Sequence, residues 1–245
     1  MEFDTAAIDA KLLTGHALGL TALELATREN EPVGGAAAER VAALLARRMS
    51  GESVARIIGQ REFYGLAFSL NEATLEPRPE TELLVDRALD ALPADGQLLD
   101  LGTGTGCIPV AILVNRPGAH AVAVDLSAKA LEAARANAER HGVAARIEFR
   151  QGNWFGALSP AGSGERFDLI VSNPPYVESG ALAMLDRQVR DRLGHVAPVP
   201  VGLLDAVAEL DLAPKGGALE AELAEDRAGL PVHHLPVGAE KPGVR

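Results

Sequence analysis

Leu-Leu-Asp-Leu-Gly-Thr-Gly-Thr-Gly, at residues 98–106, is the run of the sequence from which the architecture follows. An apolar segment typical of a buried strand leads into three glycines at alternate positions, and residues 107–115 then have the pattern of a helix. Glycine lets the chain turn sharply and lets a ligand approach the backbone, because it has no Cβ atom. The run therefore predicts a strand, a ligand-binding loop and a helix in succession.

The pattern continues as alternating strands and helices beyond this loop. Such alternation is typical of an α/β fold, in which a parallel sheet has helices on both faces and binds ligands at the carboxyl ends of its strands. The expected strands are residues 98–101, 120–124, 146–150 and 167–172, and the expected helices are residues 107–115 and 128–140.

An acidic residue, Asp125, follows the second expected strand about 20 positions beyond the loop, the spacing of a carboxylate that binds a ribose diol. Asp125 is also a candidate N-cap, as is Ser127, and the two roles are compatible. The glycine spacing is Gly-x-Gly-x-Gly and differs from the Gly-x-Gly-x-x-Gly of dinucleotide-binding loops. The Gly-Lys-Ser/Thr of a P-loop is also missing after it. A neutral loop with a ribose-binding acid indicates S-adenosylmethionine, which has a ribose but no phosphate.

The tetrapeptide Asn173-Pro174-Pro175-Tyr176 directly follows the fourth expected strand. The Asn173 side chain and the Pro174 carbonyl offer two acceptors for a planar NH₂ group, on a backbone that the prolines restrict. The Tyr176 ring can cover one face of that group. Asn and Pro are also common in turns, but the position of the tetrapeptide beside the glycine loop favours a binding site.

Composition narrows the class of protein. The chain has 245 residues and a net charge of −11, which argues against tight nonspecific binding to nucleic acid. Its single cysteine, Cys107, allows neither an internal disulfide nor a cysteine metal cluster, and its apolar surroundings favour a core position. No apolar run has the length of a membrane span, and the first residues lack a signal peptide's basic region. We expect a cytoplasmic monomer that binds neither membrane nor metal.

The segment before the sheet is predicted to contain helices and a β-hairpin. The amphipathic spacing of residues 9–20 predicts a first helix, which Gly19 can cap. Two more helices are predicted over residues 36–49 and 54–58. Residues 62–70 and 73–75 are expected to form the hairpin, and Pro79 to open the next helix. The predicted domains are a helical docking domain at 1–61, a hairpin linker at 62–77, and a Rossmann-like catalytic domain at 78–245.

These motifs together resemble the bacterial release-factor glutamine methyltransferases, also called N5-glutamine methyltransferases. Asn-Pro-Pro-Tyr also occurs in adenine amino methyltransferases, and it is the segment at residues 76–82 and the helical N-terminal domain that narrow the resemblance. The matching segments are residues 9–13, 61–65, 76–82, 100–107, 152–155 and 173–176.

The resemblance implies methyl transfer from S-adenosylmethionine to the glutamine amide of a Gly-Gly-Gln motif in class-1 peptide-chain release factors. It also implies that the N-terminal helices dock the release factor, and that Trp154 lies beside the adenine, although a tryptophan is more often a core residue. The implied catalytic residues are Asn173, Pro174 and Tyr176, and Pro175 joins them in binding the substrate. The implied cofactor-binding residues are Gly102, Thr103, Gly104, Thr105, Gly106, Asp125, Trp154 and Asn173.

The sequence departs from the family pattern in two places. Asn153 stands where the family usually has an acid, and the chain after about residue 191 lacks the pattern of the family's last strands, as if shortened. Two alternatives accompany the main hypothesis. The tetrapeptide also fits a methyltransferase acting on the amino group of adenine in nucleic acid, and the altered C-terminal segment fits a relative that binds without catalysis.

Overall fold

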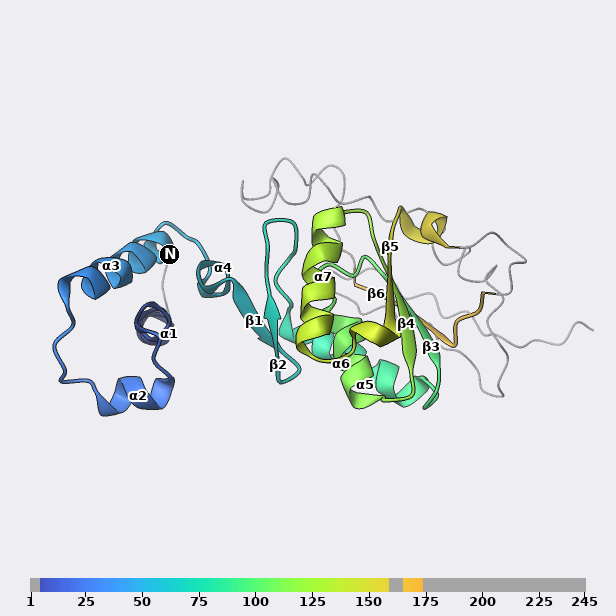
Figure 1. Ribbon diagram of the computed structural model, residues 1–245, viewed down its shortest axis with the longest axis horizontal. Helices are drawn as coiled ribbons and strands as arrows, with labels where there is room; N and C mark the ends of the chain where they lie inside the picture. Colours follow the sequence, from blue (N-terminus) through green and yellow to red (C-terminus); the bar gives the residue numbers. More distant parts are fainter. Residues whose placement is uncertain (1–4, 159–164, 174–245) are drawn as a thin grey trace, which may run out of the picture.

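The computed structural model describes residues 5–158 and 165–173 (Figure 1). The divergent C-terminal segment after about residue 191 lies outside the described residues. Within the described ranges, the N-terminal helices lie at one end of the molecule, a two-stranded hairpin follows, and a parallel sheet with its helices forms the other end (Figure 1).

The N-terminal segment contains the helices α1 (Ala6–Leu18), α2 (Ala22–Thr27), α3 (Gly35–Met49) and α4 (Val54–Ile58). Three of them agree with the sequence prediction, and α1 ends as expected at Gly19, whose φ is 67°. Helix α2 was not predicted. It begins with a capping box, in which the Thr21 side chain accepts the Glu24 N–H and the Glu24 carboxylate accepts the Thr21 N–H. The Thr-x-x-Glu spacing was the available signal.

The hairpin pairs β1 (Gln60–Phe63) with β2 (Leu66–Ser69). The sequence prediction was wrong about its turn, because residues 62–70 do not form one arm. The chain reverses at Tyr64 and Gly65, which have φ values of 53° and 71° and lie between the paired Phe63 and Leu66. A two-residue turn with two positive φ angles matches the twist of a hairpin, but it is unusual for tyrosine.

The parallel sheet has four strands: β3 (Gln97–Leu101), β4 (His120–Asp125), β5 (Ile147–Gln151) and β6 (Leu169–Ser172). Their order is β5-β4-β3-β6, so successive connections from β3 run in one direction and β6 lies on its other side. The order therefore reverses between β3 and β6, the position where open α/β sheets bind ligands. The predicted α/β class, with its preceding helices and hairpin, is confirmed.

The helices α5 (Glu82–Ala91), α6 (Cys107–Asn115) and α7 (Ala128–Arg140) pack on one another and on the sheet, and the short 3₁₀ turns are η1 (Pro79–Thr81), η2 (Ala144–Arg146) and η3 (Trp154–Ala157). Alternate strand residues such as Leu98 and Ala121 join α5 and α6 in one hydrophobic core. Their neighbours Leu99 and Val122 face a second cluster with η3. Among the described residues, helices therefore cover one face and η3 the other, whereas helices were predicted on both.

Helix α6 is apolar all round and almost wholly buried, which explains its place at the centre of the core. Cys107 at its start is buried, and burial raises the pKa of its thiol to about 12. Cys107 is thus a core residue, as expected from the sequence. Within the part of the chain that the structure describes, no helix is both long and apolar enough to span a bilayer.

Candidate functional site

The site lies at the carboxyl edge of the parallel sheet, where the strand register brings the predicted residues together. Leu101 pairs with Val124 on one side and with Ser172 on the other. The next residues along the three strands are Gly102, Asp125 and Asn173, so all three leave the sheet at the same edge. A hydrogen bond of 2.8 Å from the Ser172 hydroxyl to the Leu101 carbonyl ties the ends of β6 and β3 together.

The glycine loop, residues 102–106, depends on three positive φ angles: 76° at Gly102, 54° at Gly104 and 75° at Gly106. A Cβ atom on Gly106 would lie 3.0 Å from the Cβ of Ala134 in α7, whereas Cβ atoms on Gly102 and Gly104 would meet no described residue within 4 Å. Gly106 therefore lets α7 approach the loop, and the other two glycines leave open space above the backbone.

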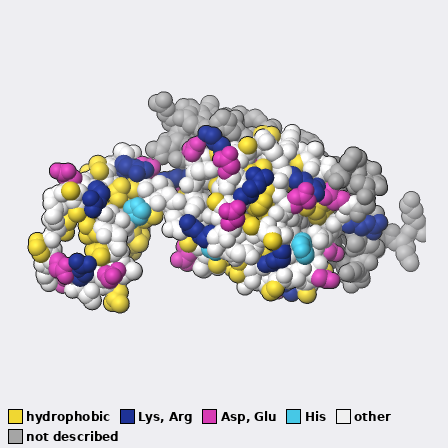
Figure 2. Space-filling view, in the orientation of Figure 1, with side chains coloured by type: hydrophobic (Ala, Val, Ile, Leu, Met, Phe, Trp, Pro, Cys, Tyr) yellow, Lys and Arg dark blue, Asp and Glu magenta, His cyan; other side chains and the backbone are white. Residues whose placement is uncertain are grey.

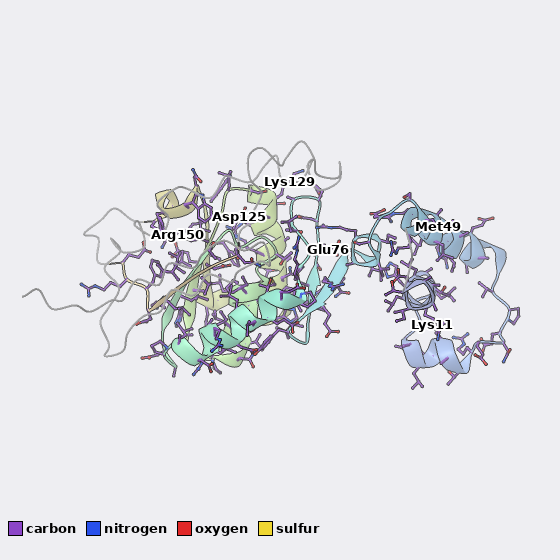
Figure 3. All side chains as sticks on the ribbon, turned by 180° about the vertical axis from the view of Figure 1, so that it is seen from behind. Lys11, Met49, Glu76, Asp125, Lys129 and Arg150 are labelled. Carbon is purple, nitrogen blue, oxygen red and sulfur yellow. The ribbon has the colours of Figure 1, made fainter. Side chains whose placement is uncertain are left out.

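Asp125 is connected to the loop through its carboxylate. One oxygen accepts the Gly104 N–H at 2.8 Å, and the other accepts the Ser127 N–H at 2.9 Å. Ser127 is the N-cap of α7, and its hydroxyl accepts the Ala130 N–H. Burial raises the pKa of Asp125, and the backbone N–H groups oppose that rise. Asp125 thus fixes the loop from the end of β4; Figure 3 shows it with Lys129, from the start of α7, near the same end of the sheet.

Asp100, the last but one residue of β3, is a buried carboxylate beneath the loop. Neither of its oxygens has a hydrogen-bond partner among the described residues, and the same is true of the Thr103 hydroxyl. Burial raises the pKa of Asp100 to about 7; Thr103 lies close enough to oppose this rise, and the charge of Asp125 adds to it. A buried carboxylate in this condition needs a ligand with a donor or a positive charge. The sequence motif contained Asp100, but no role was predicted for it.

Trp154 lies in η3 and is half-buried against the second hydrophobic cluster, with a φ of 51°. Its packing agrees with the core interpretation. Its buried indole N–H has no partner in the described part of the chain. The predicted position beside an adenine is not tested by these contacts and stays a prediction.

Asn173 is exposed at the sheet edge, immediately beyond β6. Its side-chain N–H donates to the Thr81 hydroxyl at 2.7 Å. The other residues predicted to bind the substrate, Pro174, Pro175 and Tyr176, lie outside the described residues. Of the four residues predicted to bind the substrate, Asn173 is therefore the one that the structure describes. Its contact with Thr81 was not predicted.

Segment 76–82, which carried much of the resemblance, makes contacts that explain two of its residues, Thr81 and Glu82. Thr81 holds the Asn173 side chain, and the Glu82 carboxylate accepts the Tyr64 N–H at 2.8 Å. The Tyr64 hydroxyl also donates to Asp86 at 2.7 Å, so two bonds stabilise its unusual backbone conformation. The segment thus joins the hairpin turn to the sheet edge.

Asn137 is a second residue that the sequence prediction missed. It is fully buried in α7; its carbonyl accepts the Ser69 N–H, and its NH₂ group donates to the Ser69 and Thr105 carbonyls at 3.1 and 3.0 Å. Asn137 therefore connects the end of the hairpin to the glycine loop. The signal was present, because a polar residue in the buried alanine stripe of a helix needs partners.

The described ranges 5–158 and 165–173 contain no cluster of three or more His, Cys, Asp or Glu residues that could hold an ion.

Comparison with known proteins places the chain in a family. Its residues 2–59 match the PrmC N-terminal domain family, and residues 78–197 match the methyltransferase small domain family. A release factor glutamine methyltransferase from Cereibacter sphaeroides is 42% identical over 235 residues, covering 96% of this chain and 77% of the relative. One from Agrobacterium fabrum is 39% identical over 239 residues, covering 95% and 77%.

The chain belongs to the release factor glutamine methyltransferase family. The resemblance predicted from the sequence motifs is thereby confirmed. Among solved structures, a methyltransferase from Thiobacillus denitrificans in complex with S-adenosyl-L-homocysteine is 24% identical, with a TM-score of 0.39 over 62% of this chain and 53% of that one. Family membership rests on the sequence matches, which extend over both the N-terminal helices and the sheet. The chain is an S-adenosylmethionine-dependent methyltransferase.

Proposed function

We propose that this chain transfers a methyl group from S-adenosylmethionine to the side-chain amide nitrogen of a glutamine in class-1 peptide-chain release factors, within their Gly-Gly-Gln motif. The observation that carries the proposal is the register of β3 and β6, which places Asn173 beside the glycine loop in a chain of this family. A group that holds an amide and a loop that holds a methyl donor must be neighbours for such a reaction.

The residues at the sheet edge fit S-adenosylmethionine. The open space above Gly102 and Gly104 admits a ligand close to the backbone. The partnerless carboxylate of Asp100 suits the ligand's ammonium group, and Asp125 suits its ribose diol. We assign the cofactor to residues 102–106, Asp125, Trp154 and Asn173, as the sequence predicted, and add Asp100.

The chemistry requires positioning more than acid–base catalysis. When bound, S-adenosylmethionine supplies an activated methyl group. An amide nitrogen is a poor nucleophile, because its lone pair is delocalised into the carbonyl. Oxygen acceptors on Asn173 and Pro174 would hold the two amide hydrogens and direct the nitrogen toward the methyl carbon. The nitrogen's proton becomes acidic as the bond forms, so no base is required beforehand.

The N-terminal helices offer a surface for the release factor. Several of their large apolar side chains are exposed, and Figure 2 shows hydrophobic side chains gathered on the face of these helices that is in view. An exposed apolar patch rimmed by charges is typical of a protein interface. We propose that the helical segment docks the substrate, with domains divided at residues 61 and 77, and that the enzyme acts as a cytoplasmic monomer. The exposed residues are Ile8, Leu12, Leu23, Val33 and Met49.

Transfer of radiolabelled methyl groups tests the proposal. Purified release factor and its Gly-Gly-Gln to Gly-Gly-Ala variant are each incubated with the enzyme and labelled S-adenosylmethionine. We expect label on the first protein alone. Label on both would place the modification elsewhere, and label on neither, with S-adenosylhomocysteine still bound by calorimetry, would support a binding protein without catalysis.

A further inference from the structure

The contact between Asn173 and Thr81 joins residues 92 positions apart at the edge of the site. The Asn173 side chain is exposed, whereas Thr81 is buried, with 7% of its surface exposed. The buried Thr81 hydroxyl thus holds the NH₂ group of Asn173, an exposed residue at the edge of the sheet.

The Thr81 hydroxyl is available for this contact because it does not perform its usual local role. Thr81 is the N-cap of α5, a position where a threonine side chain normally accepts a backbone N–H of the first turn. Here its backbone is helical, with φ −71° and ψ −16°, and the side chain makes no capping bond. The hydroxyl instead accepts the Asn173 N–H at 2.7 Å.

The position of Thr81 is itself fixed from both sides. Its backbone N–H donates to the Arg78 carbonyl at 3.0 Å in the turn that Pro79 opens. The next residue, Glu82, accepts the Tyr64 N–H of the hairpin turn. Thr81 therefore connects the hairpin turn and the start of α5 to the Asn173 side chain.

The hydrogen bond holds the Asn173 amide beside Thr81, and in the observed orientation the amide oxygen is left for the site. The oxygen and the NH₂ group of asparagine are nearly equal in size, so a half-turn of the amide exchanges them. With the NH₂ group bound to Thr81, the oxygen is directed away from it. After a half-turn, an NH₂ group would face the NH₂ group of the substrate, and two donors cannot pair.

We propose that Thr81 is a positioning residue that holds the Asn173 side chain at the edge of the site, in the place from which its oxygen reaches the substrate amide. This inference rests on the proposed function, since it gives Asn173 the task of accepting a hydrogen from glutamine. Thr81 is buried, and in this role it acts through Asn173.

Two substitutions of Thr81 separate its hydroxyl from its shape. Thr81→Val removes the hydroxyl and keeps the branched side chain, whereas Thr81→Ser keeps the hydroxyl. We expect Thr81→Val to lower kcat about tenfold, the loss of one oriented hydrogen bond, with the KM for release factor and the Kd for S-adenosylhomocysteine changed less than about twofold. Thr81→Ser should stay within about threefold of the wild type. Equal loss in both variants, or a loss confined to KM, would overturn the proposal.

A double substitution tests whether Thr81 acts through Asn173. In an Asn173→Ala background, Thr81→Val should cause no further loss of kcat, because the side chain that it orients is absent. A full additional tenfold loss would show that Thr81 acts by another route.

A measurement without turnover keeps this inference separate from the proposed function. The side-chain NH₂ resonances of Asn173 are identified in a ¹H–¹⁵N spectrum by their disappearance in Asn173→Ala. We expect them to shift in Thr81→Val and to remain in place in Thr81→Ser. Resonances unchanged in Thr81→Val would refute the contact. If the wild type transfers no methyl group, the proposed function fails, and these resonances still decide whether Thr81 holds the amide.

Discussion

The two sides of the site are built by different means. The glycine loop is shaped by main-chain conformation: three positive φ angles, a close approach to Ala134 and the Gly104 N–H, which Asp125 accepts. The Asn173 side depends on single side-chain hydrogen bonds between segments far apart in the sequence. Damage to the loop should therefore affect folding and cofactor binding together, whereas damage to the Asn173 side should mainly affect transfer.

Asn173→Ala is expected to have the largest effect on the rate of methyl transfer. Loss of one oriented acceptor should lower kcat about 100-fold, by analogy with removal of one oxyanion-hole donor. The side chain is exposed and outside the core, so the free energy of unfolding should change by less than about 0.5 kcal/mol. Asn115→Ala is the matched control, because Asn115 is an exposed asparagine at the end of α6. A comparable loss of kcat in the control would contradict the assignment.

Gly106→Ala should damage the loop side through stability. The added Cβ would lie 3.0 Å from Ala134, and the new alanine would have to adopt a φ of 75°. We therefore expect the free energy of unfolding, measured in urea, to fall by about 3 kcal/mol. Gly142→Ala separates the two causes, because its φ is 71° and its Cβ would meet nothing within 4 Å. The control should lose only about 1 kcal/mol. Equal losses would show that the approach of α7 is unimportant.

The buried Asp100 should give the unliganded protein a pH-dependent stability. Its pKa is raised from 3.8 to about 7 in the folded state, so the folded protein binds more protons than the unfolded chain between these values. With respect to this group, stability should therefore be greatest below about pH 4 and should fall as the pH rises to about 7. Asp100→Asn should flatten that fall, as measured by urea unfolding at several pH values. An unchanged slope would show that Asp100 is not the titrating group.

The smallest effect is expected at the docking surface. Leu23 is 73% exposed, so Leu23→Ser should leave stability unchanged and raise the KM for release factor about threefold through lost apolar contact. Val114→Ser, at an exposed position on α6, is the control and should leave KM unchanged. A change in the affinity for S-adenosylhomocysteine in Leu23→Ser, with an unchanged KM for release factor, would contradict the docking role of this surface.

Sequence patterns predicted the sheet and its loop well, since periodicity and glycine spacing are local. Helix α6 was predicted at its observed bounds, and every strand of the parallel sheet within two residues. The turn of the hairpin was misplaced because Tyr64 adopts a conformation typical of glycine, stabilised by Glu82 and Asp86 from another element. Such stabilisation is tertiary and leaves no trace in local propensity.

The candidate site was predicted less completely for the same reason. Asp125 and Asn173 could be placed because they end strands. The roles of Thr81 and Asn137 depend on partners 92 and 68 residues away. The alanine stripe around Asn137 indicates that this residue needs partners, but no local pattern indicates which partners Thr81 or Asn137 has. Thr81 even stands at a position that predicts a helix cap, a bond that it does not make.

The most direct test of the two-sided site compares Asp125→Ala and Asn173→Ala in two assays, the affinity for S-adenosylhomocysteine and the rate of methyl transfer at saturating cofactor. Asp125→Ala should weaken the affinity about tenfold, because the ribose contact and the Gly104 bond are lost, and should recover most of its rate at saturation. Asn173→Ala should keep most of its affinity, because we place Asn173 only at the methyl end of the cofactor, and should lose its rate. If both variants lose affinity and rate in equal proportion, the site is a single unit and its division into two sides is wrong.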